Sequence, residues 1–414
     1  MRRFPFAGIL VARSVSRIGS LMTFIAIPWF VLVTTGSATK AGVVAAAEMA
    51  PFVLAGLFGG PWIDHWGARR VSIVTDLASG AAVAALPALY HADALSFPVF
   101  LALVAVAGTL RGLGDTAKSA IVPRAIAASG VETTRAATIQ DGVHRLSGLL
   151  GLPMAGVLVG WIGAAEVLYV DAASFVVCAL LVALFVRVDA APAEPADREP
   201  YLRALRGGVT YLRGDRLVLA LSLMVLATNL FDQAFAAVYT PVWAHDVLHD
   251  PYALGFVGGS FALGAVLGNL GYVALAPRLP RYLTFAVCFL VGGGTRFLSM
   301  AFGGGIWPVV IVGFAAGVAM STVNPIMSAI LYERVPEAMQ ARVFGLVGAV
   351  ASAGIPLGSL LGGGLVSAVG LRWALIATGV LYGLVTVCPL VFPTWRGIDR
   401  APAAAPEPEL VASR

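Results

Sequence analysis

Acidic side chains lie inside long apolar stretches of this sequence, where an ionisable group is expensive and usually functional. Glu48 lies near the middle of one such stretch. Asp232 lies near the middle of another, with Asn229 and Gln233 beside it. Neither acid has an arginine one helical turn away, and burial without a nearby cation favours the neutral form of a carboxyl group. Asp232 and Glu48 are therefore candidate proton carriers.

Other charged residues in apolar stretches come in pairs four residues apart, which places both members on one helix face. Arg111 and Asp115 form one such pair, and Asp141 and Arg145 form another, with His144 alongside. Salt-bridged acids stay ionised, so these pairs suit a gate latch better than a proton relay. Asp141 is kept as a third candidate for proton coupling.

The alternative for the two deep acids is an ordinary structural role. Either acid could be simply hydrogen-bonded, or paired across helices with Arg13, Arg17 or Arg111.

Aromatic residues recur every four positions from Phe231 through Phe235 and Tyr239 to Trp243, so they follow one helix face. Such a wall would suit bulky apolar or cationic compounds. The alternative is that the stripe serves helix packing or faces lipid. The candidate residues for a substrate cavity are Arg13, Arg17, Trp29, Arg111, Asn229, Phe231, Gln233, Phe235 and Tyr239.

The composition indicates a polytopic membrane protein. The chain has 414 residues, of which 59% are hydrophobic and 12% charged, and its mean hydropathy is +0.89. Soluble domains average about 25% charged residues. A net charge of +5 fits topology signals and not nucleic-acid binding. The sequence contains no phosphate-binding loop, no nucleophile–base set and no metal-ligand cluster, and its three cysteines lie in apolar runs, so we expect neither enzymatic activity nor a cofactor.

A spanning helix needs about 20 apolar residues, and the sequence contains twelve such segments. They lie near 6–33, 41–60, 71–90, 97–117, 136–160, 164–187, 216–243, 252–275, 282–302, 306–331, 343–368 and 372–393. With the N-terminus inside, the inner segments hold twenty Lys and Arg residues, and the outer loops hold only Lys40 and Arg372. This asymmetry predicts that both termini are cytoplasmic.

The longest polar segment divides the spans into six and six. Residues 188–215 begin as a Pro/Ala/Glu linker and continue with Tyr201, Leu202, Leu205, Val209 and Leu212 at helical spacing, which predicts an amphipathic helix on the inner leaflet. We therefore expect an N-terminal bundle at 1–187, a cytoplasmic linker at 188–215 and a C-terminal bundle at 216–393. Residues 394–414 are Pro/Ala-rich and predict a disordered tail.

A short polar segment, GGPWIDHWGARR at 59–70, lies between the second and third apolar stretches. It resembles the signature loop of the major facilitator superfamily, Gly-x-x-x-Asp-Arg-x-Gly-Arg-Lys/Arg. Gly60, Asp64, Gly67 and Arg69 match that pattern, whereas His65 and Ala68 replace two arginines. In that family the loop clamps neighbouring helices and helps control opening. The alternative is that Arg69 and Arg70 only anchor the topology.

Most of the chain, up to about residue 393, resembles the macrolide-efflux-like branch of the drug:proton antiporters. The similar segments are ARSVSRIGSLMTFIAIPWFVLVTTGSATKAGVV, LYVDAASFVVCALLV and LYERVPEAMQARVFGLVGAVASAGIPLGSLLGGGLV. The antiporter motif of span five is degraded, because Leu152 stands between Gly151 and Pro153 in GLLGLPMAGV. The gate residues that the resemblance implies, together with the charged pairs, are Gly60, Asp64, Gly67, Arg69, Arg70, Asp76, Asp115 and Arg145.

The resemblance implies an all-α fold of twelve transmembrane helices in two six-helix bundles around a central cavity. Spans one, four, seven and ten would line the cavity, so Asp171 and Arg296 would be structural. The implied function is export of amphipathic drugs from the bacterial cytoplasm or inner leaflet in exchange for protons, by a monomer in the inner membrane in contact with lipids. The alternatives are a dedicated exporter of a siderophore or other secondary metabolite, and a facilitator without proton coupling.

Overall fold

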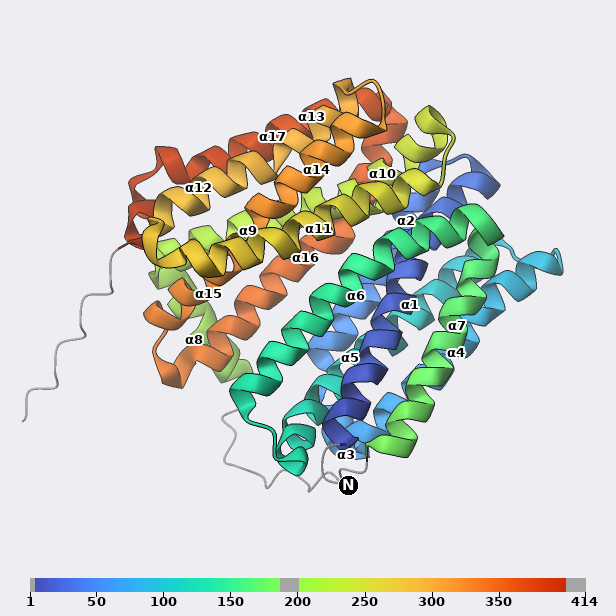
Figure 1. The fold of residues 1–414 in the computed structure, drawn as a ribbon, viewed down its shortest axis with the longest axis horizontal. Coiled ribbons are helices and arrows are strands. Elements are labelled where there is room, and N and C mark those ends of the chain that lie inside the picture. The colour runs from blue at the N-terminus through green and yellow to red at the C-terminus, as the bar shows by residue number, and fades with distance from the viewer. Residues whose placement is uncertain (1–3, 187–200, 400–414) are drawn as a thin grey trace, which may run out of the picture.

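The computed structural model describes residues 4–186 and 201–399, which are almost entirely helical (Figure 1). Twelve of its helices are long and apolar enough to cross a membrane. This confirms the twelve predicted spans. The predicted linker segment 188–200 and the tail from residue 400 lie outside the described residues, and the domain boundaries stay a prediction.

The N-terminal half forms one helical bundle, shown in blue to green in Figure 1. Its helices are α1 (Phe4–Thr35), α2 (Ala38–Phe58), α3 (Gly60–Trp66), α4 (Ala68–His91), α5 (Phe97–Ser129), α6 (Thr133–Ile162) and α7 (Ala164–Phe185). The fourth span is longer than the sequence predicts, because α5 continues past residue 117 to Ser129 and ends at Gly130 in the left-handed conformation.

The C-terminal half forms a second bundle, in which several spans are interrupted. The elements are α8 (Tyr201–Gly214), α9 (Arg216–Ala234), η1 (Phe235–Tyr239), α10 (Thr240–Trp243), η2 (Ala244–Leu248), α11 (Tyr252–Leu275), η3 (Ala276–Arg278), α12 (Arg281–Gly292), α13 (Gly294–Phe302), α14 (Ile306–Met320), α15 (Val323–Arg334), α16 (Glu337–Val369), α17 (Leu371–Val391) and η4 (Pro393–Ile398). Span seven runs through α9, η1, α10 and η2, and the first of its two π-helical turns begins at Phe235, three residues after Asp232. π-Helical turns often occur at functional sites.

Gly293 interrupts span nine for a steric reason. A Cβ at this position would clash with two ring carbons of Tyr382 on α17 and would lie 2.9 Å from the carbonyl oxygen of Phe289. Only glycine therefore allows α12 and α13 to approach α17 this closely. The break begins α13 at Gly294 and brings Arg296 toward the interior, where it is 8% exposed.

The two bundles touch at one end, which we call the closed end. There α2 packs against α16, and α6 packs against α11 (Figure 1). Glycines allow these approaches: a Cβ at Gly363 would lie 3.2 Å from the Cα of Gly42, and a Cβ at Gly255 would lie 3.2 Å from the Cα of Gly156. The hydroxyl groups of Thr39 and Ser367 are 2.5 Å apart across the same interface.

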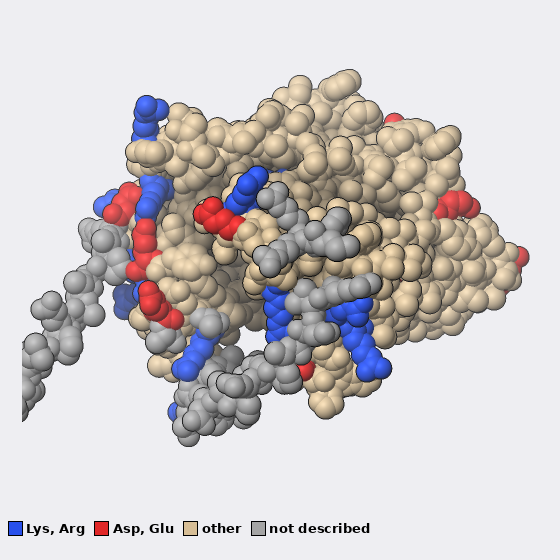
Figure 2. Space-filling model, turned by 60° about the horizontal axis from the view of Figure 1, so that its bottom comes forward, with Lys and Arg blue, Asp and Glu red and all other residues tan. Residues whose placement is uncertain are grey.

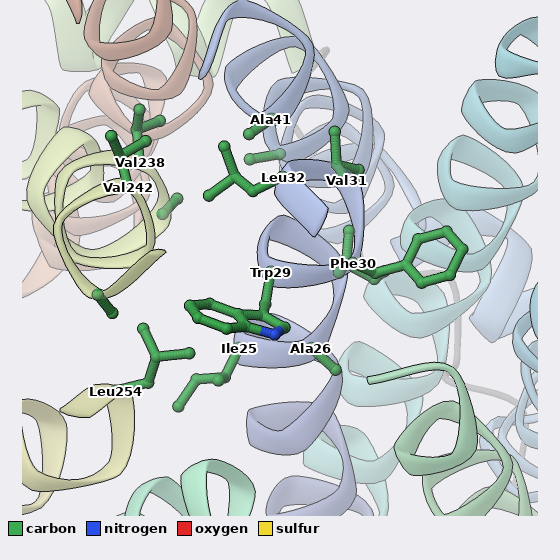
Figure 3. Close-up of a cluster of buried hydrophobic side chains, with 14 of the residues drawn as sticks. Ile25, Ala26, Trp29, Phe30, Val31, Leu32, Ala41, Val238, Val242 and Leu254 are labelled. Atoms are coloured by element: carbon green, nitrogen blue, oxygen red, sulfur yellow. The ribbon is translucent and has the colours of Figure 1, made fainter. Parts of the chain in front are cut away.

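Apolar packing completes the closed end. The indole of Trp29 points from α1 toward Val242 and Leu254 of the other bundle (Figure 3). Its ring centroid also lies 5.6 Å from that of His245 in η2. Among the described residues, this side-chain packing joins the two bundles at the closed end.

The opposite end carries most of the basic side chains, and we call it the basic end. Lys and Arg side chains gather on the face that comes forward in Figure 2. The helix ends and turns at the closed end instead carry Asp93, Glu166, Asp246 and Asp250. Lys118 departs from the predicted pattern, because it lies buried inside α5 and does not belong to a terminal loop.

Helix α8 is amphipathic, as predicted, but it packs on protein. Leu212 is buried against Val335 and Val343 at the basic ends of α15 and α16. The hydroxyl group of Tyr211 donates a 2.7 Å hydrogen bond to the carbonyl oxygen of Arg334. The C-terminal bundle thus offers an apolar surface for part of this helix, and its contact with the inner leaflet stays a prediction.

Candidate functional site

A cavity of about 650 Å³ lies inside the N-terminal bundle near the basic end. Helices α1, α2, α5 and α6 provide its walls. The lining residues are Leu10, Arg13, Ser14, Ser16, Arg17, Ser20, Leu21, Phe24, Phe52, Arg111, Asp115, Lys118, Ala137, Gln140, Asp141, Val143, His144 and Ser147. This basic-end cavity collects five residues that the sequence singles out as charged and membrane-embedded: Arg13, Arg17, Arg111, Asp115 and Asp141.

Glu48 does not stand alone. Arg111 of α5 reaches the carboxylate of Glu48 on α2 at 2.7 Å, and the two side chains are 10% and 5% exposed. The guanidinium carbon of Arg111 also lies 5.1 Å from the ring centroid of Phe52. The structure thus shows the alternative of pairing across helices, and Glu48 has a cation beside it in this arrangement.

Sequence reasoning misses a second buried pair. The ammonium group of Lys118 on α5 lies 2.6 Å from a carboxylate oxygen of Asp76 on α4, and both side chains are 2% exposed. The other oxygen of Asp76 has no hydrogen-bond partner in the described part of the chain. The Asp115 carboxylate lies 3.8 Å from Lys118, one turn away on the same helix. A longer predicted fourth span would have included Lys118, one turn after Asp115, and this spacing could have indicated the buried lysine.

The pair Asp141–Arg145 forms as the spacing predicts, at 2.7 Å. It lies near the basic end of α6 and is more exposed than the other pairs, with Asp141 59% and Arg145 32% exposed. Asp141 lines the basic-end cavity beside His144.

A second cavity, of about 340 Å³, lies between the bundles. The N-terminal bundle contributes Phe24, Ile25 and Leu152, and the C-terminal bundle contributes the rest. Those remaining residues are Asn229, Asp232, Gln233, Phe235, Ala236, Thr240, Pro241, Leu254, Val257, Gly258, Phe261, Arg296, Val309, Gly313 and Ile355. Phe24 lines both cavities, so this inter-bundle cavity adjoins the basic-end cavity.

Asp232 is the acid of the inter-bundle cavity, and it is paired. The Arg296 guanidinium donates a hydrogen bond to its carboxylate, and Arg296 is 9% exposed whereas Asp232 is 32% exposed. This corrects two expectations, namely that Asp232 has no cation beside it and that Arg296 is remote from the cavity. Both expectations considered only the residues that are near in the same helix. Asp232 on α9 and Arg296 on α13 come together only in the tertiary fold.

Amide side chains accompany this ion pair. The side-chain amide of Asn229 donates a 2.9 Å hydrogen bond to the carbonyl oxygen of Ala351. The amide nitrogen of Gln233 is buried without a partner in the described residues. The cavity therefore keeps an unused hydrogen-bond donor beside an acid.

The aromatic stripe divides between cavity and packing. Phe235 lines the inter-bundle cavity. Phe231 packs against Tyr382, and Tyr239 is buried with its hydroxyl group 2.9 Å from that of Thr378. Together with Trp29 at the closed end, these last two side chains lie outside both cavities, because four-residue spacing drifts around the helix. The structure assigns Phe231, Tyr239 and Trp29 to packing.

Asp171 is structural in its surroundings, as expected for span six. It is fully buried, and it accepts hydrogen bonds from the hydroxyl groups of Thr23 and Ser174.

Comparison with known proteins agrees with this architecture. The sequence pattern of the Major Facilitator Superfamily matches residues 9–253 and 227–412. The chain belongs to the major facilitator superfamily. It is therefore a membrane transporter and not an enzyme.

Several relatives in this superfamily cover nearly the whole chain. The multidrug efflux pump Tap of Mycobacterium tuberculosis is 28% identical and covers 97% of this chain and 96% of its own length. Macrolide efflux protein A of Streptococcus pyogenes is 21% identical over 94% of this chain and 96% of its own length. The enterobactin exporter EntS of Escherichia coli is 27% identical over 92% of each.

Solved structures share the fold. The nucleoside transporter NupG superposes with a TM-score of 0.74 at 13% identity, covering 93% of this chain and 98% of its own. A bacterial homologue of the human lysosomal transporter Spinster, in an inward-facing and unoccupied conformation, superposes with a TM-score of 0.71 at 14% identity, covering 97% and 99%. These likenesses establish the fold alone.

The superfamily's signature loop forms a short helix here. Helix α3 follows α2, and Gly67 ends it with a φ of 83°, a conformation that glycine adopts without strain. Arg69 then donates a 2.7 Å hydrogen bond to the carbonyl oxygen of Ala183 at the end of α7. Asp64 and Arg70 are exposed at the basic end. Arg69 thus joins spans three and six, which is more than a topology anchor does.

Proposed function

We propose that this chain exports amphipathic small molecules from the bacterial cytoplasm, or from the inner leaflet, in exchange for protons by alternating access. The observation that carries the proposal is the inter-bundle cavity, which is sealed at the closed end and adjoins the basic-end cavity. Its walls are mainly apolar and aromatic, with Asp232, Arg296 and Gln233 as convergent polar groups. Cavities of this composition suit amphipathic ligands.

Orientation follows from charge. Basic side chains gather at one end (Figure 2), and cytoplasmic segments of membrane proteins are enriched in Lys and Arg. We therefore place the basic end, and both termini, in the cytoplasm. In this orientation the cavities receive substrate from inside, while the packing of α2 on α16 and α6 on α11 seals the outside.

Proton coupling in this proposal works by exchange of partners. In this proposal a proton and the Arg296 guanidinium compete for the Asp232 carboxylate, and a proton replaces the guanidinium when the bundles rock. Two aromatic rings can hold Arg296 after it leaves Asp232. Its guanidinium carbon lies 5.0 Å from the ring centroid of Phe235 and 5.3 Å from that of Phe261. Cation–π contacts of this kind stabilise a buried arginine by about 0.5–2 kcal/mol. Asp232 would then link proton entry to a rearrangement of span seven.

The test is Asp232→Asn in everted membrane vesicles with a pH-sensitive dye. We expect the variant to lose substrate-induced proton release while it keeps counterflow exchange without a gradient. Glu333→Gln is the matched control, because Glu333 is also salt-bridged, to Arg281 at 2.7 Å, but lines neither cavity. A proton signal of wild-type size from Asp232→Asn would remove Asp232 as the carrier and leave Glu48 as the acid to test.

Two alternative functions can also be tested. Similarity to the enterobactin exporter EntS favours testing a dedicated exporter of one secondary metabolite, which would raise resistance to none of a panel of unrelated drugs in an efflux-deficient host. A facilitator would move substrate downhill but would not concentrate it when a pH gradient is imposed.

A further inference from the structure

The charges of the basic-end cavity are unbalanced. Its two buried cations, Arg111 and Lys118, are matched by Glu48 and Asp76 at 2.7 and 2.6 Å. Among the described residues, neither a hydrogen bond nor an ion pair within 4.0 Å joins Arg13 or Arg17 to a carboxylate. A guanidinium group in a membrane-embedded cavity normally has an anionic partner.

Arg13 and Arg17 are placed to act together. They lie one turn apart on α1, and both line the basic-end cavity. The acid that acts on both is Asp115, whose carboxylate attracts them electrostatically from α5. Asp115 is 53% exposed and already lies 3.8 Å from Lys118. One shared carboxylate cannot neutralise both arginines.

The surrounding groups complete an anion site. His144 of α6 faces the same cavity and can donate a hydrogen bond from its ring. Asp141, the other acid in the wall, is held by Arg145 at 2.7 Å. Phe24 and Leu21 supply apolar surface beside the arginines, and Phe24 continues into the inter-bundle cavity.

We propose that Arg13 and Arg17 bind the anionic group of an amphipathic ligand, a carboxylate, sulfonate or phosphate, while its apolar body lies against Phe24 and extends toward the inter-bundle cavity. Two guanidinium groups suit such groups because each can donate paired, charge-assisted hydrogen bonds to oxygens. This inference rests on the proposed function and specifies its substrate class. The same chemistry is found in a free acidic amphiphile and in the phosphate of a lipid headgroup.

The test measures binding of three dansyl probes to the full chain in dodecyl maltoside at pH 7.5. The probes are 11-(dansylamino)undecanoate, its methyl ester and dansylcadaverine, which are anionic, neutral and cationic. We expect the carboxylate to bind at least about tenfold more tightly than the ester, since one charge-assisted bond is worth that factor. We also expect this preference to weaken as salt is raised.

Four variants sharpen the result. Arg13→Gln combined with Arg17→Gln should abolish the preference for the carboxylate and leave ester binding within about twofold. Arg17→Lys should keep only part of the preference, because the charge remains but the paired hydrogen bonds of the guanidinium are lost. Asp115→Asn should strengthen carboxylate binding several-fold by removing the competing anion. The control that combines Lys40→Gln with Arg372→Gln, both at the closed end, lowers the net charge by the same two units and should leave the preference unchanged.

The outcomes separate cleanly. Equal binding of carboxylate and ester by the wild type, or an unchanged preference in the double variant, would overturn the inference. If the double variant fails to fold, the Asp115→Asn result decides, and weaker carboxylate binding there counts against it. Displacement of the probe by phosphatidylglycerol identifies a lipid headgroup as the occupant, and no displacement identifies a free amphiphile; both agree with the anion site.

Export can fail independently of this site. Anion binding that depends on Arg13 and Arg17, in a chain that exports nothing, would contradict the proposed function and leave the anion site intact. Export of cationic and neutral amphiphiles as fast as anionic ones would do the reverse.

Discussion

The glycine contact between α2 and α16 sets how firmly the closed end is sealed. Gly363→Ala would place a methyl group 2.7 Å from the carbonyl oxygen of Ala38 and 3.2 Å from the Cα atoms of Gly42 and Thr39. These neighbours are backbone atoms, so they cannot rotate away, and the two helices must move apart. Gly363→Ala therefore penalises the closed arrangement and leaves the arrangement with separated ends untouched.

The size of the effect follows from overpacking, which costs about 1–3 kcal/mol per inserted group. Alanine also has a helix propensity about 1 kcal/mol better than glycine, but α16 is helical in both arrangements and this gain cancels. The ratio of closed to open molecules should then fall roughly 5- to 150-fold. Export should slow, because the cycle needs both states.

Gly364→Ala is the matched control, because it changes the adjacent residue of the same helix and its added Cβ meets no atom within 4 Å. The assay is a spin-label distance across the closed end, from Ala94 in the α4–α5 turn to Val247 in η2, with Cys178, Cys288 and Cys388 replaced. We expect Gly363→Ala to populate a longer distance and Gly364→Ala to reproduce the parent. Identical distance distributions for the two variants would refute this account of the seal.

Other predictions address the closed end, the buried pair Asp76–Lys118 and the signature loop. Cysteines at Thr39 and Ser367, whose hydroxyl groups are 2.5 Å apart, should form a disulfide that stops transport until dithiothreitol is added; undiminished transport by the fully cross-linked protein would show that this end need not open. Lys118→Met should lower the unfolding free energy by about 3–5 kcal/mol, because it leaves Asp76 buried and unpaired, and adding Asp76→Leu should restore most of it; an equal melting temperature for Lys118→Met and wild type would contradict the pair's importance. Asp64→Asn should reduce transport while membrane insertion stays normal, and normal export by a well-expressed variant would argue against a gating role for α3.

The sequence alone determined the number of membrane helices and the membrane class of the protein. Each span must satisfy its backbone hydrogen bonds within itself, so a run of about 20 apolar residues identifies a helix without knowledge of its neighbours. The signature loop could be recognised for a similar reason, because Gly60, Asp64, Gly67 and Arg69 lie within one short segment. Where helix ends depend on packing, as at the basic end of α5, the predicted boundary was short.

Only the tertiary structure decided which charges meet. Asp76 and Lys118 are 42 residues apart, and Asp232 and Arg296 are 64 residues apart. Their meeting depends on how neighbouring helices are rotated and on the break at Gly293, and neither is encoded in the spacing within one helix. The sequence therefore indicated which side chains are costly to bury, whereas helix packing selected the partner of each. In a membrane the partner of a buried charge determines its chemistry, because lipid cannot replace that partner.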